Sequence, residues 1–277
     1  MLIGIFTIFS LAVAAGLCLL TGSFAGLGWL WVLPVTAVGM FVLLAGIWFV
    51  VLVVMANAAD MENKQEEDNK FYRWVLHNTI DAILPLLGVR FHTKGFEQKL
   101  PEGRFLLVSN HLHDIDPAML LHCFPKSQLA FISKKENDGL FAIGPLMHKT
   151  LCQSIDRDDD RQALQVILKC IRILKEDKAS IAVFPEGGTN HDDKLHPFRP
   201  GVFKIAQKAN VPIVVCTMKN TKDAIPNMLH LRKTDIEVSL LDVIYPESYA
   251  DLGTTEMAQQ IYELMAADLG PDLVAEE

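Results

Sequence analysis

His111 is followed five residues later by Asp116 in a short polar stretch that could hold a general base. An apolar run at 105–108, too short for a helix, ends just before this stretch and predicts a buried strand. Asp116 and Pro117 form a typical helix start, because a carboxylate caps free N–H groups and proline fits the first turn. Residues five apart on one helix point in different directions, so only a turn brings the two side chains together. An imidazole held by a carboxylate is a general base; the alternative is a polar loop residue beside an ordinary helix cap.

The composition separates an apolar N-terminal part from a charged remainder. The chain has 277 residues, of which 51% are hydrophobic, and a formal net charge of −8. No Asp, Glu, Lys, Arg or His precedes Asp60. The acidic excess argues against nucleic-acid binding, which needs a basic surface. The five cysteines lack CxxC spacing and no zinc motif is present, so we expect reduced cysteines and no metal site.

Residues 1–57 are predicted to form two membrane-spanning helices joined by a glycine-rich turn. The apolar runs 2–20 and 29–57 reach the length of about 20 residues that crosses the hydrocarbon core. The first run lacks the basic start of a signal peptide. A hairpin leaves both ends on one side, and the first basic residues after it favour the cytoplasm for that side. We therefore expect a cell-membrane protein with two spans and a cytoplasmic catalytic domain.

Residues 58–88 are predicted to connect this hairpin to the remainder of the chain. The segment 60–70 is a charged linker, and 71–87 carries apolar residues at helical spacing. With Trp74 and Pro85, this amphipathic helix suits the interface of a bilayer. Packing of the same helix against the soluble domain is the alternative, and the sequence does not choose between the two.

Residues 89–277 alternate short apolar runs with helical segments, which is typical of an α/β domain. The predicted strands are 89–93, 105–109, 129–133, 153–156, 180–184, 212–218 and 236–243. The predicted helices of this part include 162–175, 201–209 and 255–269. We expect a mostly parallel sheet that is flanked by helices.

Polar candidates recur just beyond the ends of successive predicted strands. Each of the following stands after a different strand: His111, Lys135, Arg157 and Glu186. In a parallel sheet these ends share one edge, and that edge is where open α/β sheets bind ligands. Any one of the four is a weak signal, but four in succession predict a site.

The residue types at this edge suit a phosphate ester. Arg157 can grip a phosphate with two hydrogen bonds, and Lys135 would add positive charge. Gly187, the first of two glycines after Glu186, exposes backbone N–H groups to an anion or carbonyl, and Glu186 could bind hydroxyls. Arg199 lies at the start of a predicted helix whose N-terminus could extend the anion site. The plain alternatives are a solvated charge run, a surface turn and a tight turn.

Five blocks of this chain resemble the PlsC-like 1-acylglycerol-3-phosphate acyltransferases. In chain order they are Asn110-His111 with Asp116-Pro117 (NHxxxxDP), the lysine block at 130–136, 154–157 ending in IDR, 183–187 containing FPEG, and 211–214. Order and spacing agree over residues 90–218, about half of the chain. One HxxxxD pattern is weak, whereas five blocks in order are specific.

The resemblance implies the synthesis of phosphatidic acid at a membrane. His111 would deprotonate the free sn-2 hydroxyl of lysophosphatidic acid, and Asp116 would orient the imidazole. The hydroxyl oxygen would attack an acyl thioester and release CoA or acyl carrier protein. The expected partners are lysophosphatidic acid, acyl-CoA or acyl carrier protein as co-substrate, and membrane lipids, with no further cofactor, no metal and no nucleic acid.

The resemblance also assigns substrate-binding residues. Arg157 and Lys135 would hold the acceptor phosphate, while Glu186 and Gly187 would position the acceptor. The family usually reads FPEGTR, and this chain lacks that arginine. Arg199 is the candidate replacement, which leaves the acceptor headgroup open.

Other functions fit parts of the same pattern. His111, His113, Asp114 and Asp116 resemble the ligand cluster of a metal-dependent hydrolase, although the final histidine of the HxHxDH pattern is missing. A membrane-anchored protein that binds lipid without catalysis is a second alternative. Within the acyltransferases, the acceptor could also be glycerol 3-phosphate or another lysolipid.

Overall fold

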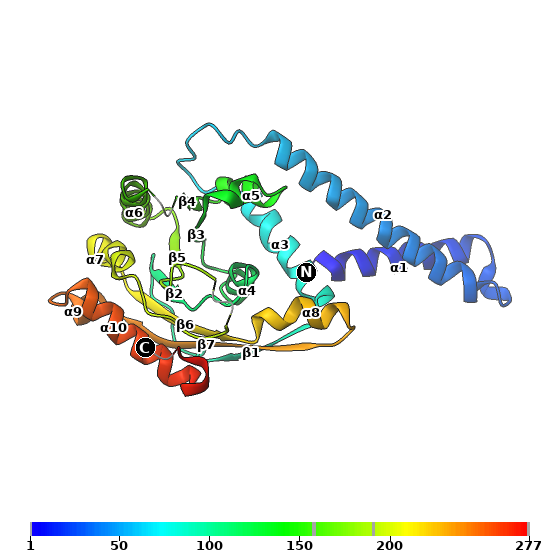
Figure 1. Ribbon diagram of the computed structural model, residues 1–277. Helices are drawn as coiled ribbons and strands as arrows, with labels where there is room; N and C mark the ends of the chain where they lie inside the picture. The colour runs from blue at the N-terminus through cyan, green and yellow to red at the C-terminus, as the bar shows by residue number, and fades with distance from the viewer. Residues whose placement is uncertain (1, 157–158, 190–191, 276–277) are drawn as a thin grey trace.

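A seven-stranded sheet forms the centre of the computed structural model, which describes residues 2–156, 159–189 and 192–275 (Figure 1). The strands lie in the order β1-β7-β6-β2-β5-β3-β4. Their bounds are β1 (Val89–Lys94), β2 (Leu106–Ser109), β3 (Leu129–Lys134), β4 (Gln153–Ile155), β5 (Ser180–Val183), β6 (Ile213–Lys219) and β7 (Thr234–Ile244). Each predicted strand corresponds to one of these.

Five neighbouring strands of this sheet run parallel. β6, β2, β5, β3 and β4 point the same way, whereas β7 is antiparallel to β6 and pairs in parallel with β1. β2 and β5 are central and buried at every residue, which is why their sequences are continuous apolar runs. The carboxyl ends of β2, β5, β3 and β4 therefore share one edge. The predicted α/β class with a mostly parallel sheet is confirmed.

Helices cover both faces of the sheet (Figure 1). On one side lie α3 (Lys70–Leu86), α4 (Asp116–Cys123), α5 (Ile143–Lys149) and α8 (Ala224–Leu229). On the other lie α6 (Asp160–Lys175), α7 (Lys204–Ala209), α9 (Pro246–Tyr249) and α10 (Thr254–Leu269). Along β2 the side chains alternate: Leu107 is buried with residues of α3 and α4, while Leu106 and Val108 are buried with residues of α6, α7 and α10.

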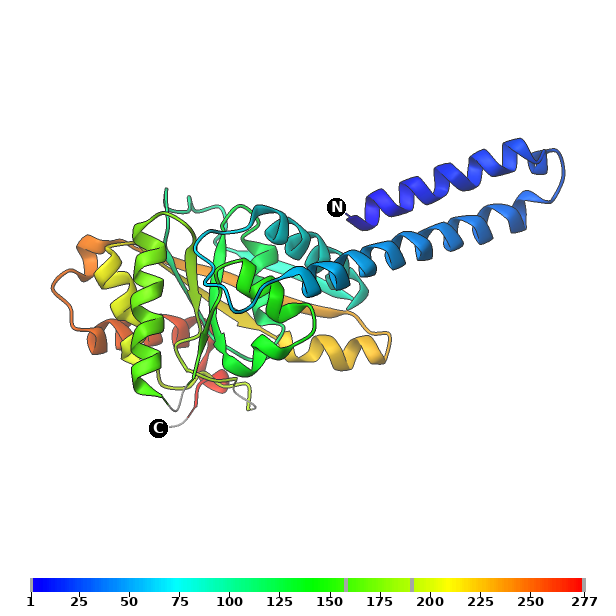
Figure 2. The same cartoon turned by 90° about the horizontal axis from the view of Figure 1, so that it is seen from above.

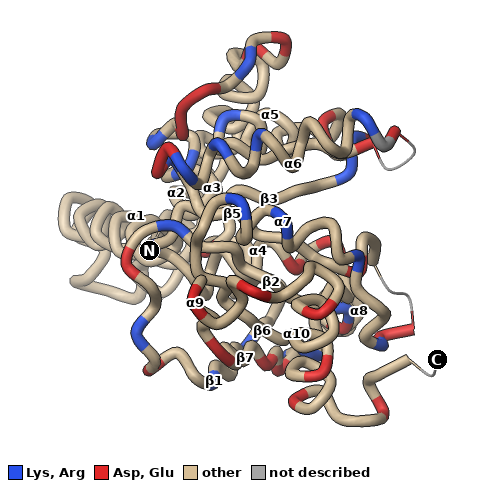
Figure 3. The backbone as a smooth tube through the Cα atoms, turned by 90° about the vertical axis from the view of Figure 1, so that its left-hand side faces the viewer, with Lys and Arg blue, Asp and Glu red and all other residues tan. Residues whose placement is uncertain are grey.

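Two N-terminal helices form an antiparallel hairpin that projects from this domain (Figure 2). α1 (Leu2–Leu20) and α2 (Trp29–Ala58) are long and apolar enough to cross a membrane, by length and composition. Phe6 packs edge-on against Phe41 across the pair. Most large apolar side chains of the hairpin are exposed, and it contains no Lys, Arg, Asp or Glu (Figure 3).

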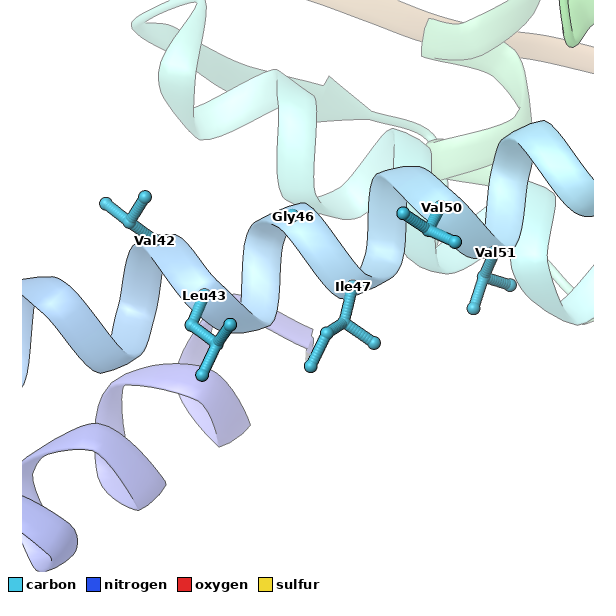
Figure 4. A pocket seen from close by; sticks show the side chains of 6 residues that line it. All are labelled: Val42, Leu43, Gly46, Ile47, Val50 and Val51. Carbon is cyan, nitrogen blue, oxygen red and sulfur yellow. The ribbon is translucent and has the colours of Figure 1, made fainter.

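The surface of α2 includes an apolar hollow of about 520 Å³ (Figure 4). It is lined by Val42, Leu43, Gly46, Ile47, Val50 and Val51. These side chains offer dispersion contacts and no hydrogen bonds. Such a surface suits hydrocarbon rather than water as its surroundings.

The base of the hairpin is joined to the α/β domain through α3. Met55 of α2, Val75 of α3 and Leu146 of α5 form a small buried cluster. Trp48 Nε1 donates a hydrogen bond of 3.1 Å to Thr79 Oγ1. The outward face of α3 exposes Phe71, Trp74, Ile83 and Leu86. The helix predicted at 71–87 therefore packs on the domain with one face and presents an apolar surface with the other.

The charged segment between α2 and α3 is bound to the domain by ion pairs. Three successive carboxylates, at 66, 67 and 68, meet Arg172 (2.6 Å), Lys178 (3.1 Å) and Arg73 (2.7 Å). The Asn69 N–H also donates to the carbonyl oxygen of Lys149 (3.0 Å). These contacts hold the linker against the surface of the domain.

Candidate active site

His111 and Asp116 meet in the loop between β2 and α4. Asp116 Oδ2 accepts a hydrogen bond from His111 Nδ1 (2.9 Å) and from the backbone N–H groups of Leu112 (2.6 Å) and His113 (2.9 Å). The Asp116 side chain is 0% exposed. We predicted a carboxylate that caps the following helix; instead Asp116 is the first residue of α4 and turns back to the preceding loop. The reason is that the tight loop directs its own N–H groups at the carboxylate.

The hydrogen bond to Asp116 determines which ring nitrogen of His111 carries the proton. An ionised carboxylate only accepts hydrogen bonds, so the proton of a neutral imidazole lies on Nδ1, and Nε2 carries the lone pair. Nε2 lies 3.2 Å from the hydroxyl oxygen of Thr189, and the same hydroxyl lies 3.4 Å from Asp114 Oδ1, so its one proton has two acceptors. A hydroxyl group thus lies within hydrogen-bond distance of Nε2.

Aromatic packing fixes the plane of the imidazole. The rings of His111 and Phe184 are stacked, with centroids 4.1 Å apart and an interplanar angle of 13°. Phe184 is in turn stacked against the buried Phe131 of β3. Because the ring has one carboxylate partner and one flat neighbour, its orientation is set before any substrate binds.

Asn110 ties the start of this loop to the neighbouring strand. Its side-chain amide donates to the carbonyl oxygen of Met218 (2.9 Å) and accepts from the Met218 N–H (2.8 Å). The side chain is buried, so this amide pair replaces the backbone pairing that is lost where β2 ends. The residue before His111 is therefore held in register with β6.

Glu186 joins two loops at the edge of the sheet. One carboxylate oxygen accepts from the backbone N–H of His111 (2.7 Å) and the other from the backbone N–H of His196 (3.0 Å). The carboxylate thus positions the backbone of His111, and the contact with substrate hydroxyls that we predicted for Glu186 stays a prediction. His196 also bonds to Asp192, at 3.0 Å. Burial acts to raise the pKa of Asp192, but its hydrogen bonds to His196 and to the Lys194 N–H, together with the charge of His196, outweigh burial, and the pKa lies below its usual value.

Gly187 makes room for the side chain of Arg199. Its φ is +79°, a backbone conformation that glycine adopts without strain. A Cβ at this position would lie 2.5 Å from Arg199 Nε. The backbone N–H of Arg199 donates to the carbonyl oxygen of Pro185 (2.8 Å). The guanidinium is therefore brought against the turn that follows β5, next to the strand that carries His111.

Of the two remaining predicted cations, the structure describes Lys135. Lys135 follows β3, which β5 separates from β2, and its exposed ammonium is 3.6 Å from Asp156 Oδ2. Arg157 lies outside the described residues. The structure thus brings His111, Asp116, Glu186, Gly187 and Arg199 together and places Lys135 two strands away along the same edge.

The acyltransferase family model matches residues 90–219, from β1 to the end of β6. The human 1-acyl-sn-glycerol-3-phosphate acyltransferase alpha is 28% identical over 177 residues, which are 64% of this chain and 61% of the human protein. The matched part, just under half of this chain, is thus similar to the acyltransferases. The resemblance seen in the five sequence blocks is confirmed.

Other proteins similar to this chain extend the comparison. The yeast (Saccharomyces cerevisiae) 1-acyl-sn-glycerol-3-phosphate acyltransferase is 25% identical over 201 residues, covering 71% of this chain and 66% of its own. The crystal structure of the 1-acyl-sn-glycerophosphate (LPA) acyltransferase PlsC from Thermotoga maritima aligns with a TM-score of 0.61 at 17% identity, over 80% of this chain and 87% of that chain. At that identity it shows the fold. The chain spans about 60% of the length of the first curated relatives.

Thr189 and Phe184 were not among the site residues predicted from the sequence. Both flank the Pro185–Gly188 turn, and the two glycines were the signal that the turn brings its neighbours close to a site. Within the described part of the chain, no group of three or more His, Cys, Asp and Glu side chains is placed to hold a metal ion. In the proposed metal cluster, His113 Nδ1 instead accepts from the Ile115 N–H (3.3 Å).

Replacing Gly187 by alanine is expected to displace Arg199 and lower acyl transfer. The new Cβ collides with the guanidinium, and the positive φ costs about 1–2 kcal/mol for a residue with a side chain. Initial rates of acyl transfer would report the displacement of Arg199, and the urea midpoint would report the loss of stability from the backbone strain. Gly201→Ala is the matched control, because a Cβ there meets nothing within 4 Å. Equal losses in both variants would contradict a specific role for the Gly187–Arg199 contact.

Proposed function

We propose that this protein is a membrane-bound acyltransferase that transfers an acyl group from acyl-CoA or acyl carrier protein to the sn-2 hydroxyl of lysophosphatidic acid and forms phosphatidic acid. One observation carries the proposal: His111 has its Nδ1 bound to a buried carboxylate and its Nε2 facing a hydroxyl group. Relatives named 1-acyl-sn-glycerol-3-phosphate acyltransferase support the choice of substrate.

The proposed reaction needs one base and an activated acyl group. The acceptor hydroxyl displaces Thr189 from His111 Nε2 and gives its proton to that nitrogen as its oxygen attacks the thioester carbonyl. Asp116 stabilises the imidazolium that forms, since it accepts the Nδ1 hydrogen bond. When the tetrahedral intermediate collapses, the C–S bond breaks and the leaving thiolate takes the proton from Nε2. The ester and a free thiol are the products.

Cations at the same edge of the sheet are proposed to bind the acceptor phosphate. Arg199 lies against the turn next to the loop of His111, and Lys135 directly follows β3. Arg157, which lies outside the described residues, comes two positions after the last residue of β4 in the sequence. A guanidinium can bind two phosphate oxygens at once, which fixes the distance from the phosphate to the reacting hydroxyl. Arg199 thereby takes the place of the arginine that the FPEGTR block lacks.

The hairpin is proposed to span the cell membrane with the α/β domain on the cytoplasmic side. Its exposed apolar side chains and lack of charge support lipid surroundings for α1 and α2. Both long-chain substrates reside at the bilayer surface. A hairpin docked through α3 holds the site next to that surface rather than in bulk water.

Arg199→Ala is expected to raise the KM for lysophosphatidic acid about tenfold or more, because a hydrogen bond to a charged group contributes roughly 1.5–3 kcal/mol. The KM for the acyl donor should change little. A monoacylglycerol lacks the phosphate, so its KM should be the same for the native protein and the Arg199→Ala variant. An unchanged KM for lysophosphatidic acid would remove Arg199 from the phosphate site, and the same comparison applies to Arg157→Ala.

The function itself is tested with purified protein in detergent, radiolabelled acyl-CoA or acyl carrier protein, and a panel of acceptors with a chelator present. We expect the highest rate with lysophosphatidic acid and no loss with the chelator. A preference for glycerol 3-phosphate or another lysolipid would change the assigned acceptor. Release of free acid without ester formation, or chelator-sensitive activity, would contradict the proposed reaction.

A further inference from the structure

A tight apolar turn precedes α5 and remains exposed. Residues 140–143 connect the 3-10 helix η2 (Lys135–Gly139) to α5. Leu140, Phe141 and Ile143 are 46%, 61% and 52% exposed. Three large apolar side chains on four successive residues of a surface turn are unusual, because loops in contact with water are normally polar.

The backbone of this turn is strained. The Ile143 N–H donates to the carbonyl oxygen of Phe141 (2.7 Å), so the hydrogen bond spans only three residues. Ala142 between them has φ 58° and ψ −36°, a γ-turn conformation that is rare for a residue with a side chain. Strain of this kind persists only where the surroundings impose it. Here it holds Phe141 and Ile143 in place although neither is buried.

Rigid contacts fix the turn relative to α2. A Cβ on Gly144 would collide with the carbonyl oxygen of Asp138, so the chain can pass this point only with glycine. Leu146, one turn into α5, is buried against Met55 of α2. The Phe141 ring lies 6.4 Å from that of Phe49, which is also on α2. The turn is thus part of the rigid junction between hairpin and domain.

The pairing of α1 with α2 indicates how deep in the bilayer the turn at 140–143 lies. The contact between Phe6 and Phe41 sets α1 and α2 side by side, so that the start of α1 lies abreast of the segment around Gly46. α2 has 30 residues, a length of about 45 Å, whereas the hydrocarbon core is about 30 Å thick. The last part of α2 therefore extends beyond the core on the side of the domain. Phe49 and Phe141 lie where that part begins, which is the depth at which aromatic side chains gather in membrane proteins.

We propose that residues 140–143 form a membrane-inserted turn, a contact with lipid separate from the hairpin and from α3. The proposal rests on the proposed membrane location of the hairpin. The occupant of this surface is the acyl-chain region just below the headgroups, because the turn offers apolar side chains and lies beside α2. The turn is connected to the carboxyl end of β3 by η2. Its insertion into lipid therefore also fixes the distance between the bilayer and this edge of the sheet.

Photo-crosslinking in nanodiscs of phosphatidylcholine and phosphatidylglycerol tests this turn. Phe141→p-benzoylphenylalanine keeps the aromatic shape and reports the molecules that touch position 141. Phe9→p-benzoylphenylalanine in α1 is the control for lipid contact. Tyr245→p-benzoylphenylalanine, which is 47% exposed in the native chain beside α9 at the far end of the domain, is the control for water contact (Figure 1). Lipid adducts are identified by mass spectrometry, and acyl transfer is measured on each preparation.

We expect lipid adducts at positions 141 and 9 and none at 245. Adducts at position 9 without adducts at 141 would overturn the inserted turn and leave the hairpin in the membrane. The absence of lipid adducts at both positions would overturn the inserted turn and the membrane location of the hairpin. Acyl transfer that is absent from every preparation, with adducts as expected, would count against the proposed function alone.

Discussion

His111→Gln is expected to reduce acyl transfer by about 10²–10⁴-fold while leaving the binding of lysophosphatidic acid nearly unchanged. Glutamine is polar and of similar length but cannot take a proton at Nε2, so the acceptor hydroxyl loses its base. The effect should appear in kcat with little change in the acceptor's KM. Initial rates with saturating acyl-CoA, together with lysophosphatidate binding by calorimetry in detergent, would measure both quantities.

His113→Gln is the matched control for this experiment. It lies two residues further along the same loop, and its Nδ1 accepts from the Ile115 N–H rather than from a carboxylate. We expect it to retain most of the activity. If His113→Gln abolished transfer and His111→Gln left turnover within a few-fold of the native rate, the base would have to be reassigned.

Arg73→Met is expected to destabilise the protein by about 3–5 kcal/mol, because it leaves the Asp68 carboxylate buried without its cation. The guanidinium contacts both oxygens of Asp68 and the carbonyl oxygens of Leu129 (2.8 Å) and Thr150 (2.9 Å). Arg73 and Asp68 side chains are 8% and 5% exposed, so water cannot replace these bonds in the folded state. Urea unfolding in detergent, followed by circular dichroism, would measure the loss.

Arg90→Met is the control for the loss of a surface cation. Its partner is Asp235 at 3.3 Å, and the two side chains are 57% and 53% exposed. Pairs of this kind contribute about 0–1 kcal/mol. A double variant of Arg73→Met with Asp68→Leu should recover part of the loss, since no buried charge remains unpaired. Equal losses of stability in Arg73→Met and Arg90→Met would show that the buried pair does not hold the linker between α2 and α3 to the domain.

The sequence by itself determined the elements and the chemical candidates. Hydrophobic patterns located the two N-terminal helices and the seven strands. A buried parallel strand such as β2 or β5 and an apolar helix each need a continuous run of apolar residues, whereas the largely exposed β1 alternates apolar and polar residues. The offset between His111 and Asp116 predicted that the two side chains meet, since a strand-to-helix loop can join two such residues, and the structure confirms this contact. The positions of Glu186 and Gly187 after a strand placed them at the same edge.

Only the tertiary structure decided how these candidates act. Asp116 binds the loop before it, Glu186 joins two backbones, and Thr189 meets Nε2 of His111. Arg199 reaches Gly187 from twelve residues away, and Arg73 holds oxygens of segments that lie 56 and 77 residues further along the chain. Periodicity and spacing describe near neighbours in the chain. These contacts depend on the order of strands in the sheet and on the path of each loop, which close packing of distant segments determines.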